Sequence, residues 1–495
     1  MQDYSIINER DNVAVALKDI AKGTVILAGG KQVTVQEDIM RGHKVTLCDI
    51  PAGENVIKYG SPIGHTLCDV PAGHHVHTQN VKTNLGELLE YEYQPVNSSI
   101  KMAEEKKYFD GYRRADGKVG VRNEIWVIPT VGCVNSIAVA IAEAAKKKHG
   151  TGAVEDFIAF PHPYGCSQMG DDQENTRTIL ADLIHHPNAG GVLVLGLGCE
   201  NSNIPVLKEY LGEYDENRVK FLQCQDEDDE MEAAERLMDE LVAYASVFHR
   251  EKTEAAELII GMKCGGSDGL SGITANPTVG AFSDLLVAQG GTTILTEVPE
   301  MFGAETLLMN RCATPELFEK TVAMINDFKE YFMRHNQTIY ENPSPGNKKG
   351  GISTLEDKSL GCTQKSGTAP VMDVLPYGAR VETKGLNLLS APGNDLVAST
   401  ALAASGAQIV LFTTGRGTPF ASPVPTVKIS TNSALANKKE KWIDFNCGVL
   451  TEDAVLSELA GQLFDFVLDV ASGKKVKAEP AGVHDMAIFK QGVTL

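Results

Sequence analysis

The chain has 495 residues and a formal net charge of -20 at pH 7. A chain of this length exceeds one hydrophobic core, so two to four domains are expected. The acidic excess argues against a surface for nucleic acid or anionic membrane, because either needs concentrated positive charge. No run reaches the ~18 apolar residues of a membrane span and the N-terminus lacks a signal-peptide pattern, which predicts a cytoplasmic protein. The ten cysteines include no C-x-x-C pair, so free thiols are expected rather than disulfides or a zinc ribbon.

A repeat marks the N-terminal part of the chain. Four short segments share an acidic residue, a branched apolar residue, a glycine a few positions on and then valine; they begin at Asp19, Asp38, Asp49 and Asp69. This pattern fits a turn that feeds a short strand. We predict a small all-β domain over residues 1–97, built by duplication, and a polar linker over residues 98–107.

Residues 71–80 read PAGHHVHTQN, with three histidines in four residues. On an extended strand His75 and His77 share one face. Two imidazoles do not fill a metal site, so a solvated surface strand is the alternative. His74 and His75 occupy variable positions of the repeat, which leaves His77 as the candidate, presented toward a metal held elsewhere.

Beyond residue 107 short apolar runs end in glycine-rich loops and precede helical patterns, which is typical of parallel βα units. The runs lack polar alternation and therefore predict strands buried on both faces; they include IWVIPTV, GGVLVLGLG, ELIIGMK, TTILTE and IVLFTTG. A charged break at Arg250 divides an α/β middle domain, residues 108–250, from an α/β C-terminal domain, residues 251–495. Residues 342–370 carry no periodicity and predict a long functional loop.

Cysteines recur where the predicted strands end. Ligands of open α/β sheets bind at the carboxyl ends of the strands. A single cysteine is most often a small buried side chain, but recurrence at comparable places indicates thiol chemistry or metal binding. The residues concerned are Cys133, Cys166, Cys199, Cys264 and Cys362.

The loop that begins at Lys263 reads KCGGSDGLSG and has the character of an anion cradle, because consecutive small residues let backbone amides converge on an oxyanion. The lysine precedes the glycines, unlike a nucleotide phosphate loop, and no nucleotide cofactor is expected. Ser267 and Asp268 in the loop, and Asn276 after it, suit recognition of hydroxyls and carboxylates. A tight strand-to-helix turn is the alternative.

Three glutamates, Glu297, Glu300 and Glu305, surround the end of the following strand. Carboxylates clustered there could hold a divalent ion, alone or with a thiolate. Glu297 is the first candidate among them, and Glu305 could simply begin a helix, where acidic residues are favoured.

In so acidic a chain, the candidates for binding an anion are the cations in glycine-rich loops. Arginine grips both oxygens of a carboxylate with its planar fork, and a lysine of lowered pKa could act as a base. The candidates are Lys58, Arg122 with its neighbour Asn123, Lys365 and Arg416, and Asn135 joins them as a polar residue at a strand end.

Taken together, these motifs resemble the altronate/galactarate dehydratase family over essentially the whole chain. The segments that carry the resemblance are GHKVTL, NVIKYGSPIG, VHTQN, GYRRADGKVGVRN, PTVGCVN, HPYGC, LGLGCENSN, KCGGSDGLSGITANP, EMFGAE, PGNKKGG, DKSLGC and FTTGRGTP. One departure is Gln79, where relatives often carry histidine, so a role for position 79 as a metal ligand is in doubt.

The resemblance implies a hydro-lyase that removes water from a sugar acid. It implies a β-clip (SAF-like) N-terminal domain, a middle domain used in homodimerisation and a Rossmann-like C-terminal domain with a metal site. The expected ion is Fe²⁺, with Mn²⁺ as the alternative. The length is more typical of the altronate-specific members than of the longer galactarate-specific ones.

The chemistry of such an elimination defines the roles to be filled. Removing the proton beside a carboxylate creates an enediolate, which needs a base and electrophilic stabilisation. A divalent ion can stabilise that charge and polarise the departing hydroxyl. With the resemblance, metal binding is predicted at Glu297, Cys264 and Cys362, the base is Lys365 or His77, and Asp268 is a further catalytic candidate. The candidate substrate-binding residues are Lys58, Arg122, Asn123, Asn135, Ser267, Asn276 and Arg416.

Three alternatives stay open at this point. The scattered cysteines could hold an iron-sulfur cluster in place of a single ion. A sulfolactate-type lyase is a second enzymatic possibility, although one continuous chain favours the sugar-acid enzyme. A non-catalytic carbohydrate-binding protein is the third, and it would not need so many polar, glycine-rich strand ends.

Overall fold

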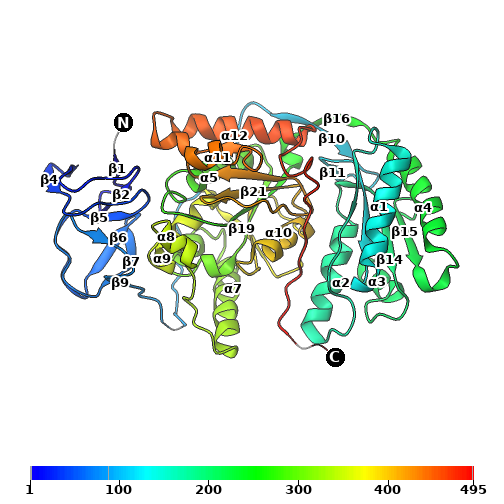
Figure 1. The fold of residues 1–495 in the computed structure, drawn as a ribbon, viewed down its shortest axis with the longest axis horizontal. Helices are drawn as coiled ribbons and strands as arrows, with labels where there is room; N and C mark the ends of the chain where they lie inside the picture. Colours follow the sequence, from blue (N-terminus) through cyan, green and yellow to red (C-terminus); the bar gives the residue numbers. More distant parts are fainter. Residues whose placement is uncertain (1–2, 87, 493, 495) are drawn as a thin grey trace.

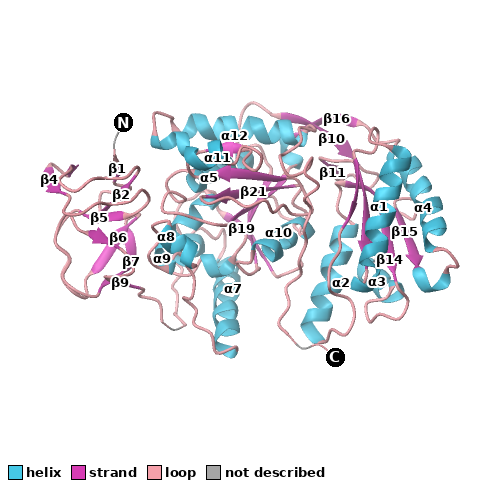
Figure 2. Cartoon of the chain, in the orientation of Figure 1, coloured by secondary structure: helices cyan, strands magenta, loops and turns pink. Residues whose placement is uncertain are grey.

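The computed structural model describes residues 3–86, 88–492 and 494. Figure 1 shows three parts in a row: a small β domain at one end and two α/β domains. Their order in space differs from their order in the chain, because the C-terminal domain lies between the N-terminal and middle domains (Figure 1). Figure 2 shows that helices cover the sheets of the two α/β domains, whereas the β domain is drawn as strands and loops.

The N-terminal domain is all-β, as predicted. Its strands form a four-stranded sheet in the order β1-β2-β5-β8, a hairpin β3-β4 and a three-stranded sheet β6-β7-β9. Their bounds are β1 (Tyr4–Ser5), β2 (Val13–Ala16), β3 (Val25–Ala28), β4 (Lys31–Thr34), β5 (Lys44–Thr46), β6 (Asn55–Lys58), β7 (Ser61–Thr66), β8 (His75–Val76) and β9 (Val81–Lys82).

The repeated acidic residue caps a turn in the paired copy of the repeat. Asp19 accepts a hydrogen bond from the amide of Arg41 at 2.8 Å, and Asp38 accepts one from the amide of Lys22 at 2.8 Å. The second pair repeats this reciprocal arrangement at the same distance: Asp49 with Ala72, and Asp69 with Ala52. The duplication is therefore structural as well as sequential, and each half is closed by its two acidic residues.

The polar segment after the β domain is held against the C-terminal domain. The hydroxyl of Tyr93 donates to the carbonyl of Cys312 at 2.6 Å. The amides of Val96 and Ala103 donate to carbonyls of the C-terminal domain at 2.9 and 2.8 Å. Through these contacts the chain passes the C-terminal domain and enters the middle domain beyond it.

The middle domain is a four-stranded parallel sheet in the order β13-β12-β14-β15, with helices on both faces. Helices α1 and α4 pack on one face, and α2 and α3 pack on the other. The bounds are β12 (Glu124–Pro129), α1 (Asn135–His149), β13 (Asp156–Ala159), α2 (Gly170–Ile184), β14 (Ala189–Gly196), α3 (Ile204–Leu211), β15 (Val219–Gln223) and α4 (Glu230–Ala245). A small antiparallel sheet of β10 (Tyr108–Arg113), β11 (Val119–Gly120) and β16 (Arg250–Glu254) joins this domain to the next.

The C-terminal domain is built on a seven-stranded parallel sheet in the order β19-β20-β18-β17-β21-β22-β23. Its strands are β17 (Ile259–Cys264), β18 (Thr292–Leu295), β19 (Val371–Leu375), β20 (Gly385–Leu389), β21 (Ile409–Thr414), β22 (Thr426–Ser430) and β23 (Phe445–Asn446). Its helices are α5 (Ala275–Ala288), α6 (Glu305–Met309), α7 (Pro315–Arg334), α8 (Pro345–Lys349), α9 (Leu355–Cys362), α10 (Asp395–Ala404), α11 (Ser433–Lys438) and α12 (Leu456–Ala471). The predicted strands are confirmed, and α10 shares one hydrophobic cluster with α2 of the middle domain.

The prediction of a long loop over residues 342–370 is wrong. This stretch contains α8, α9 and a 3₁₀ turn over Thr363–Ser366. Every residue of α9 is buried, so the helix has no solvent-exposed face and its sequence shows none of the periodicity by which a surface helix is recognised.

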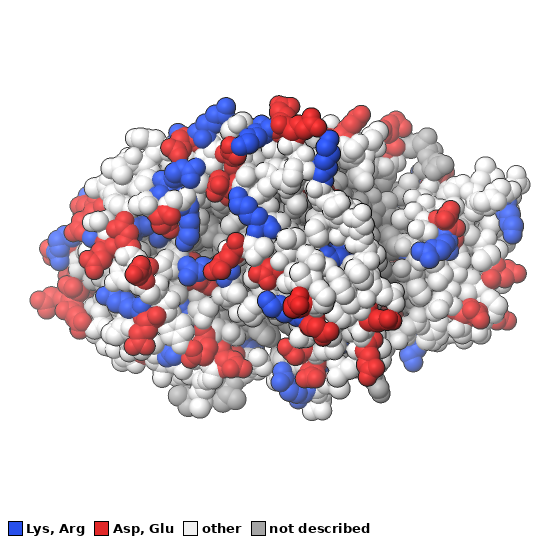
Figure 3. All heavy atoms as spheres, turned by 180° about the vertical axis from the view of Figure 1, so that it is seen from behind, with Lys and Arg blue, Asp and Glu red and all other residues white. Residues whose placement is uncertain are grey.

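Charges of both signs are mixed over the face shown in Figure 3, without one continuous basic field. None of the helices in the described part of the chain combines the length and apolar character that a membrane crossing requires.

Candidate active site

Three potential metal ligands meet at the carboxyl edge of the seven-stranded sheet. Cys264 is the last residue of β17, Glu300 ends the 3₁₀ turn after β18, and Cys362 is the last residue of α9. Their ligand atoms all lie within 4.8 Å of one another, and all three residues are buried. Parallel strands bring their carboxyl ends to one edge, which is why residues so distant in sequence converge here.

A single carboxylate oxygen lies between the two sulfur atoms. Glu300 Oε2 is 3.0 Å from Cys264 Sγ and 3.2 Å from Cys362 Sγ, and the two sulfurs are 3.5 Å apart. Two sulfurs and one carboxylate form a mixed donor set that suits a borderline divalent ion such as Fe²⁺ or Zn²⁺ better than Mg²⁺.

Two buried lysines complete the charge balance of this group. Lys365 Nζ donates to Cys264 Sγ at 3.0 Å, and Lys358 Nζ lies 2.6 Å from Glu300 Oε1. The hydrogen bond from Cys362 lowers the pKa of Cys264 to about 6, and both lysines act in the same direction. Burial opposes ionisation of Glu300, but Lys358 and Lys365 outweigh it and hold its pKa at about 2.

The pKa values of the other two groups, Cys362 and Lys365, are raised. The hydrogen bond to Cys264 raises the pKa of Cys362 well above its ordinary value. Burial opposes the charged form of Lys365, but the neighbouring thiols raise its pKa. At neutral pH the group therefore holds one thiolate, one carboxylate, one thiol and two ammonium groups, and Lys365 does not have the lowered pKa expected of a base.

Glu297 orients Cys264 and does not join the three ligand atoms. Its Oε2 accepts from the amide of Cys264 at 2.8 Å, and its Oε1 is 3.1 Å from Lys263 Nζ. Burial, with the charge of Glu300, raises its pKa well above the ordinary value. The geometry thus favours Glu300 over Glu297, which was the first candidate from the sequence. Glu305 bonds instead to Lys329 Nζ at 3.0 Å.

A cavity of about 550 Å³ opens over this group. Cys264, Glu300 and Lys358 line it together with Gly265 and Gly266 of the predicted cradle, and residues 341–345, 347 and 348 form another wall. The exposed Arg416 lies beside the cradle, because a Cβ added to Gly266 would stand 3.5 Å from Arg416 Cβ. The cavity has ample room for a small acid, since one water occupies ~30 Å³.

The N-terminal domain is fixed to α9 by a buried ion triad. Asp357 accepts from Lys44 Nζ at 2.8 Å and from Lys58 Nζ at 2.9 Å, and all three side chains are at most 2% exposed. Lys58 is thereby engaged with Asp357, and the structure gives it a docking role in place of the predicted substrate contact. The same helix carries Lys358 and Cys362, so this contact also positions these two side chains.

Three histidines of the N-terminal domain lie together beside the cavity wall. The rings of His43, His75 and His77 have centroids 4.8 to 5.6 Å apart. His43 Nδ1 is 3.0 Å from His75 Nε2, and His43 Nε2 is 3.3 Å from the carbonyl of Lys349, the residue after Lys348 of the wall. The Nδ1 of His77 is buried and has no hydrogen-bond partner.

Burial lowers the pKa of His75 to about 4 and that of His77 to about 3, and it lowers the pKa of His43 as well. These imidazoles are therefore neutral at pH 7. The sequence analysis missed His43. The signal for it was the repeat, because β5, which begins next to His43, pairs with β8, which carries His75.

Three other predicted residues, Asp268, Asn276 and Ser267, lie in or next to the loops that form the site. Asp268 accepts from the amide of Leu270 in its own loop at 3.1 Å and from Thr431 Oγ1, just after β22, at 3.0 Å. Asn276 Nδ2 donates to the carbonyl of Gly361 at 2.9 Å, which fixes the residue before Cys362. Ser267 Oγ is buried without a partner.

Three predicted residues lie outside the site. Arg122 is 0% exposed and pairs with Glu479 at 2.7 Å, at the contact of the middle and C-terminal domains. Asn123 is also buried, and its Oδ1 accepts from Arg114 at 2.7 Å. Asn135 bonds to the loop of His162 in the middle domain. Arg122 and Asn123 have no exposed surface for a substrate, which corrects the prediction that they bind one.

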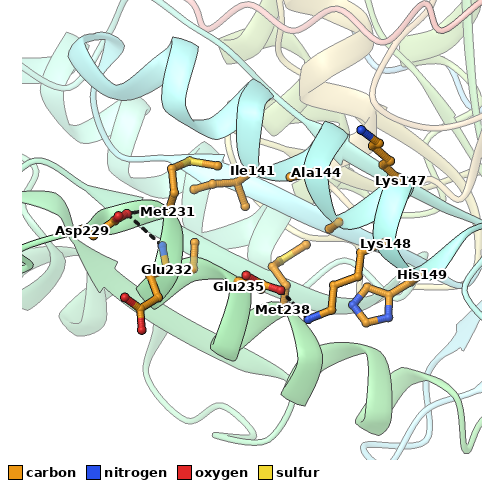
Figure 4. A pocket seen from close by; sticks show the side chains of 12 residues that line it. Ile141, Ala144, Lys147, Lys148, His149, Asp229, Met231, Glu232, Glu235 and Met238 are labelled. Carbon is orange, nitrogen blue, oxygen red and sulfur yellow. Dashed lines mark hydrogen bonds and ion pairs between the residues drawn. The ribbon is translucent and has the colours of Figure 1, made fainter.

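A larger cavity, about 650 Å³, lies between α1 and α4 of the middle domain. Figure 4 shows Lys148 directed at Glu235 there, with the two side chains paired. The residues that line this cavity include no cysteine, so its chemistry is not that of the C-terminal site.

Comparison with known proteins identifies the family of the chain. It is 54% identical over 497 residues to the altronate dehydratase of Bacillus subtilis (strain 168), which covers 100% of both chains. The chain belongs to the altronate/galactarate dehydratase family. Family models match residues 2–84 (altronate/galactarate dehydratase SAF domain), 111–246 (D-galactarate dehydratase/altronate hydrolase, second domain) and 255–494 (D-galactarate/altronate dehydratase, C-terminal).

Three further relatives match most of the chain at different levels of identity. The altronate dehydratase of Escherichia coli (strain K12) is 54% identical over 493 residues, 99% of this chain and 100% of its own. The galactarate dehydratase (L-threo-forming) of the same organism is 34% identical over 98% of this chain and 96% of its own. The β subunit of (2R)-sulfolactate sulfo-lyase from Chromohalobacter salexigens is 32% identical over 77% of this chain and 97% of its own. The chain is thus a dehydratase-type lyase.

Proposed function

We propose that this enzyme is an altronate dehydratase, which removes water from D-altronate to give 2-dehydro-3-deoxy-D-gluconate in hexuronate catabolism. The observation that carries the proposal is the 54% identity along the full chain to two altronate dehydratases, against 34% to a galactarate dehydratase. A cavity with a thiolate-carboxylate group at its base is the matching feature of the fold.

We further propose that Cys264, Glu300 and Cys362 hold Fe²⁺, with Mn²⁺ as the alternative. The donor set and the mutual distances of the three ligand atoms support this assignment. A bound divalent ion supplies electrophilic stabilisation to the charge that develops on substrate oxygens. Because Cys264 and Glu300 are already ionised near neutral pH, only Cys362 has a proton to release when the ion binds.

The lysines have an electrostatic role in this proposal. Elimination takes the proton from C2 of the substrate, expels the C3 hydroxyl as water after it gains a proton, and leaves an enol that becomes the 2-keto acid. Lys358 lines the cavity and carries a raised pKa because, although burial opposes it, Glu300 and the thiols favour the charged form. A fixed ammonium there stabilises the negative charge of the enediolate.

Of the two candidate bases, we propose His77. Its imidazole is neutral, and its Nδ1 has no competing hydrogen bond. Lys365 is held as an ammonium by the thiols beside it. The N-terminal domain would then contribute the base and the C-terminal domain the electrophile, which explains why the two are joined by the buried triad on α9.

A panel assay tests the proposal. D-altronate, galactarate and (2R)-sulfolactate are offered anaerobically with Fe²⁺ and a thiol reductant, and 2-keto acid and sulfite are measured. We expect 2-keto acid from D-altronate with a kcat/KM at least about tenfold above that for galactarate. Preferential sulfite release would favour the sulfo-lyase relative, and no 2-keto acid from any substrate would refute the dehydratase assignment.

The resemblance also supports a homodimer formed through the middle domain. Light scattering of the purified enzyme would give twice the mass of the chain, and a monomer mass at all concentrations would contradict it.

A further inference from the structure

Each strand of the middle-domain sheet is followed by a cysteine at its carboxyl edge. Cys133 follows β12, Cys166 follows β13, Cys199 follows β14 and Cys224 follows β15 directly. The first three are exposed. Cys224 is half-buried and packs against the cluster of α1 and α4, and burial raises its pKa to about 11. Three thiols therefore face solvent at one edge of one sheet, and the dehydratase site in the C-terminal domain does not use them.

Two of these cysteines lie in copies of one short motif. Residues 132–136 read GCVNS and residues 198–202 read GCENS. The asparagine of each copy bonds to the loop that carries Cys166. Asn135 Nδ2 donates to the carbonyl of His162 at 2.9 Å, and Asn201 Oδ1 accepts from the amide of Ser167 at 3.0 Å. The repeated motif thus ties the loops of Cys133 and Cys199 to the loop of Cys166.

Backbone hydrogen bonds also join the three cysteine loops. The amide of Gly132 donates to the carbonyl of Tyr164 at 3.0 Å, and the amide of Ser202 donates to the carbonyl of Gly165 at 3.2 Å. Gly165 has φ +98°, and a Cβ there would stand 1.9 Å from the carbonyl oxygen of Thr130. Only glycine fits this approach. Because β13, β12 and β14 are neighbours in the sheet and neighbouring strands are ~4.8 Å apart, the three cysteine loops leave adjacent strand ends.

The spacing of the thiols indicates what they would hold. Among the described residues, the group of Cys264, Glu300 and Cys362 is the one in which three ligand atoms come within 4.8 Å of one another. The three exposed thiols do not form such a group, so at least one pair of their sulfur atoms is more than 4.8 Å apart, which is wider than the ligand spacing around a single ion with Zn–S bonds of ~2.3 Å. A multi-iron core bridges wider gaps between cysteines.

We propose that Cys133, Cys166 and Cys199 form a three-thiolate site for a [4Fe–4S] cluster on the middle domain. Such a cluster usually takes four cysteines, so three leave one iron open to an oxygen ligand, water or the hydroxyl of a small molecule. Helices α1, α2 and α3 begin just after the three cysteine loops, and their N-termini favour the negative charge of a thiolate-bound cluster. The site is separate from the proposed dehydratase centre.

Cluster assembly requires no electron transfer from the protein. The core contains two ferrous and two ferric ions with four sulfides, all supplied from solution. Each of the three thiols releases its proton to the buffer as its sulfur binds one iron.

Anaerobic reconstitution tests the site. The full-length protein is incubated with ferrous iron, ferric iron and sulfide, desalted, and assayed for visible absorbance, iron and acid-labile sulfide. We expect a brown protein, and loss of absorbance and labile sulfide to near background in Cys133→Ser, Cys166→Ser and Cys199→Ser. Exposed cysteines of the N-terminal domain supply matched controls, so Cys48→Ser and Cys68→Ser are expected to retain both signals.

Several outcomes would overturn the proposal. A colourless wild-type protein, metal without labile sulfide, or full signals in the triple Cys133/Cys166/Cys199→Ser variant would each do so. Loss of the signals in Cys264→Ser but not in the triple variant would move the cluster to the C-terminal site. Circular dichroism of each variant shows whether a lost signal reflects unfolding, and a folded variant that keeps its colour counts against the site. The outcome is independent of whether D-altronate is turned over.

Discussion

Lys365 donates a hydrogen bond from Nζ to Sγ of Cys264 at 3.0 Å, and both side chains are buried. With the hydrogen bond from Cys362, this contact keeps the pKa of Cys264 at about 6. The fold thus holds Cys264 as a thiolate, the form that the proposed metal binding requires, because ligands must be deprotonated before an ion can bind.

Replacing that ammonium should therefore weaken catalysis and metal binding together. In Lys365→Met we expect kcat to fall by about 100-fold or more, and the affinity for Fe²⁺ to decline more steeply on acidification, because the pKa of Cys264 rises. Steady-state kinetics and metal titration at several pH values measure both effects. Lys348→Met, which changes another cavity-lining lysine, should leave the pH dependence of Fe²⁺ affinity as in wild type. A Lys365→Met enzyme within twofold of wild-type kcat would contradict this role.

Asp357 holds the N-terminal domain on α9, and its loss leaves two buried lysines without a counter-charge. Burial opposes ionisation of Asp357, but Lys44 and Lys58 overcome it and lower its pKa. We expect Asp357→Asn to reduce the free energy of unfolding by about 3–5 kcal/mol, measured by urea unfolding.

A control for Asp357→Asn is Glu104→Gln. Glu104 pairs with Lys101 at 3.0 Å on the surface, with both side chains about 85% exposed. Exposed pairs contribute little, so the urea midpoint of Glu104→Gln should match that of wild type. Equal midpoints for Asp357→Asn and wild type would show that the triad does not fasten the domain.

The histidine group makes stability depend on pH. The pKa values of His75 and His77, about 4 and about 3 in the folded protein, lie below the ordinary 6.5. Between these values the unfolded chain binds more protons than the folded one, so the free energy of unfolding falls as pH decreases from about 6.5 toward 4. Urea midpoints of wild type should show this decrease, and the double variant His75→Gln/His77→Gln should show a smaller one. Identical slopes in the two proteins would exclude the contribution.

Arg122 should behave as a structural residue. Its guanidinium is buried against Glu479, at the contact of two domains. In Arg122→Ala we expect a loss of about 3–5 kcal/mol, seen as a lower Tm, with an unchanged KM for D-altronate in the enzyme that remains folded. A raised KM with an unchanged Tm would restore the substrate-binding role.

The sequence alone predicts the parallel sheets and the sheet edge that carries the site. Its apolar runs lack polar alternation and precede helical patterns, which is typical of buried parallel strands. Cys264 and Cys362 follow from that logic and from the family motifs. Helix α9 could not be recognised, since burial on all sides removes its periodicity. Lys58 and Arg122 were predicted to bind substrate because they are cations in glycine-rich loops of an acidic chain. In the structure Asp357 and Glu479, hundreds of residues away in the chain, form ion pairs with them.

The choice between Glu297 and Glu300 shows a further limit. Both follow β18, and only the left-handed backbone of Glu297, with φ +71°, and the turn after it decide which carboxylate reaches the thiols. His43 was missed for a related reason, because its neighbours His75 and His77 lie more than thirty residues further along the chain and meet it only through strand pairing.

The sharpest test of the metal centre is an anaerobic titration of Fe²⁺, without sulfide, into wild type, Glu300→Ala and Glu341→Ala, the last being a change elsewhere in the cavity lining. We expect one tightly bound Fe²⁺ in wild type and Glu341→Ala, and an affinity lowered by about 100-fold or more in Glu300→Ala, with loss of D-altronate turnover. Wild-type iron affinity and turnover in Glu300→Ala would contradict the assignment of Cys264, Glu300 and Cys362 as the catalytic metal site.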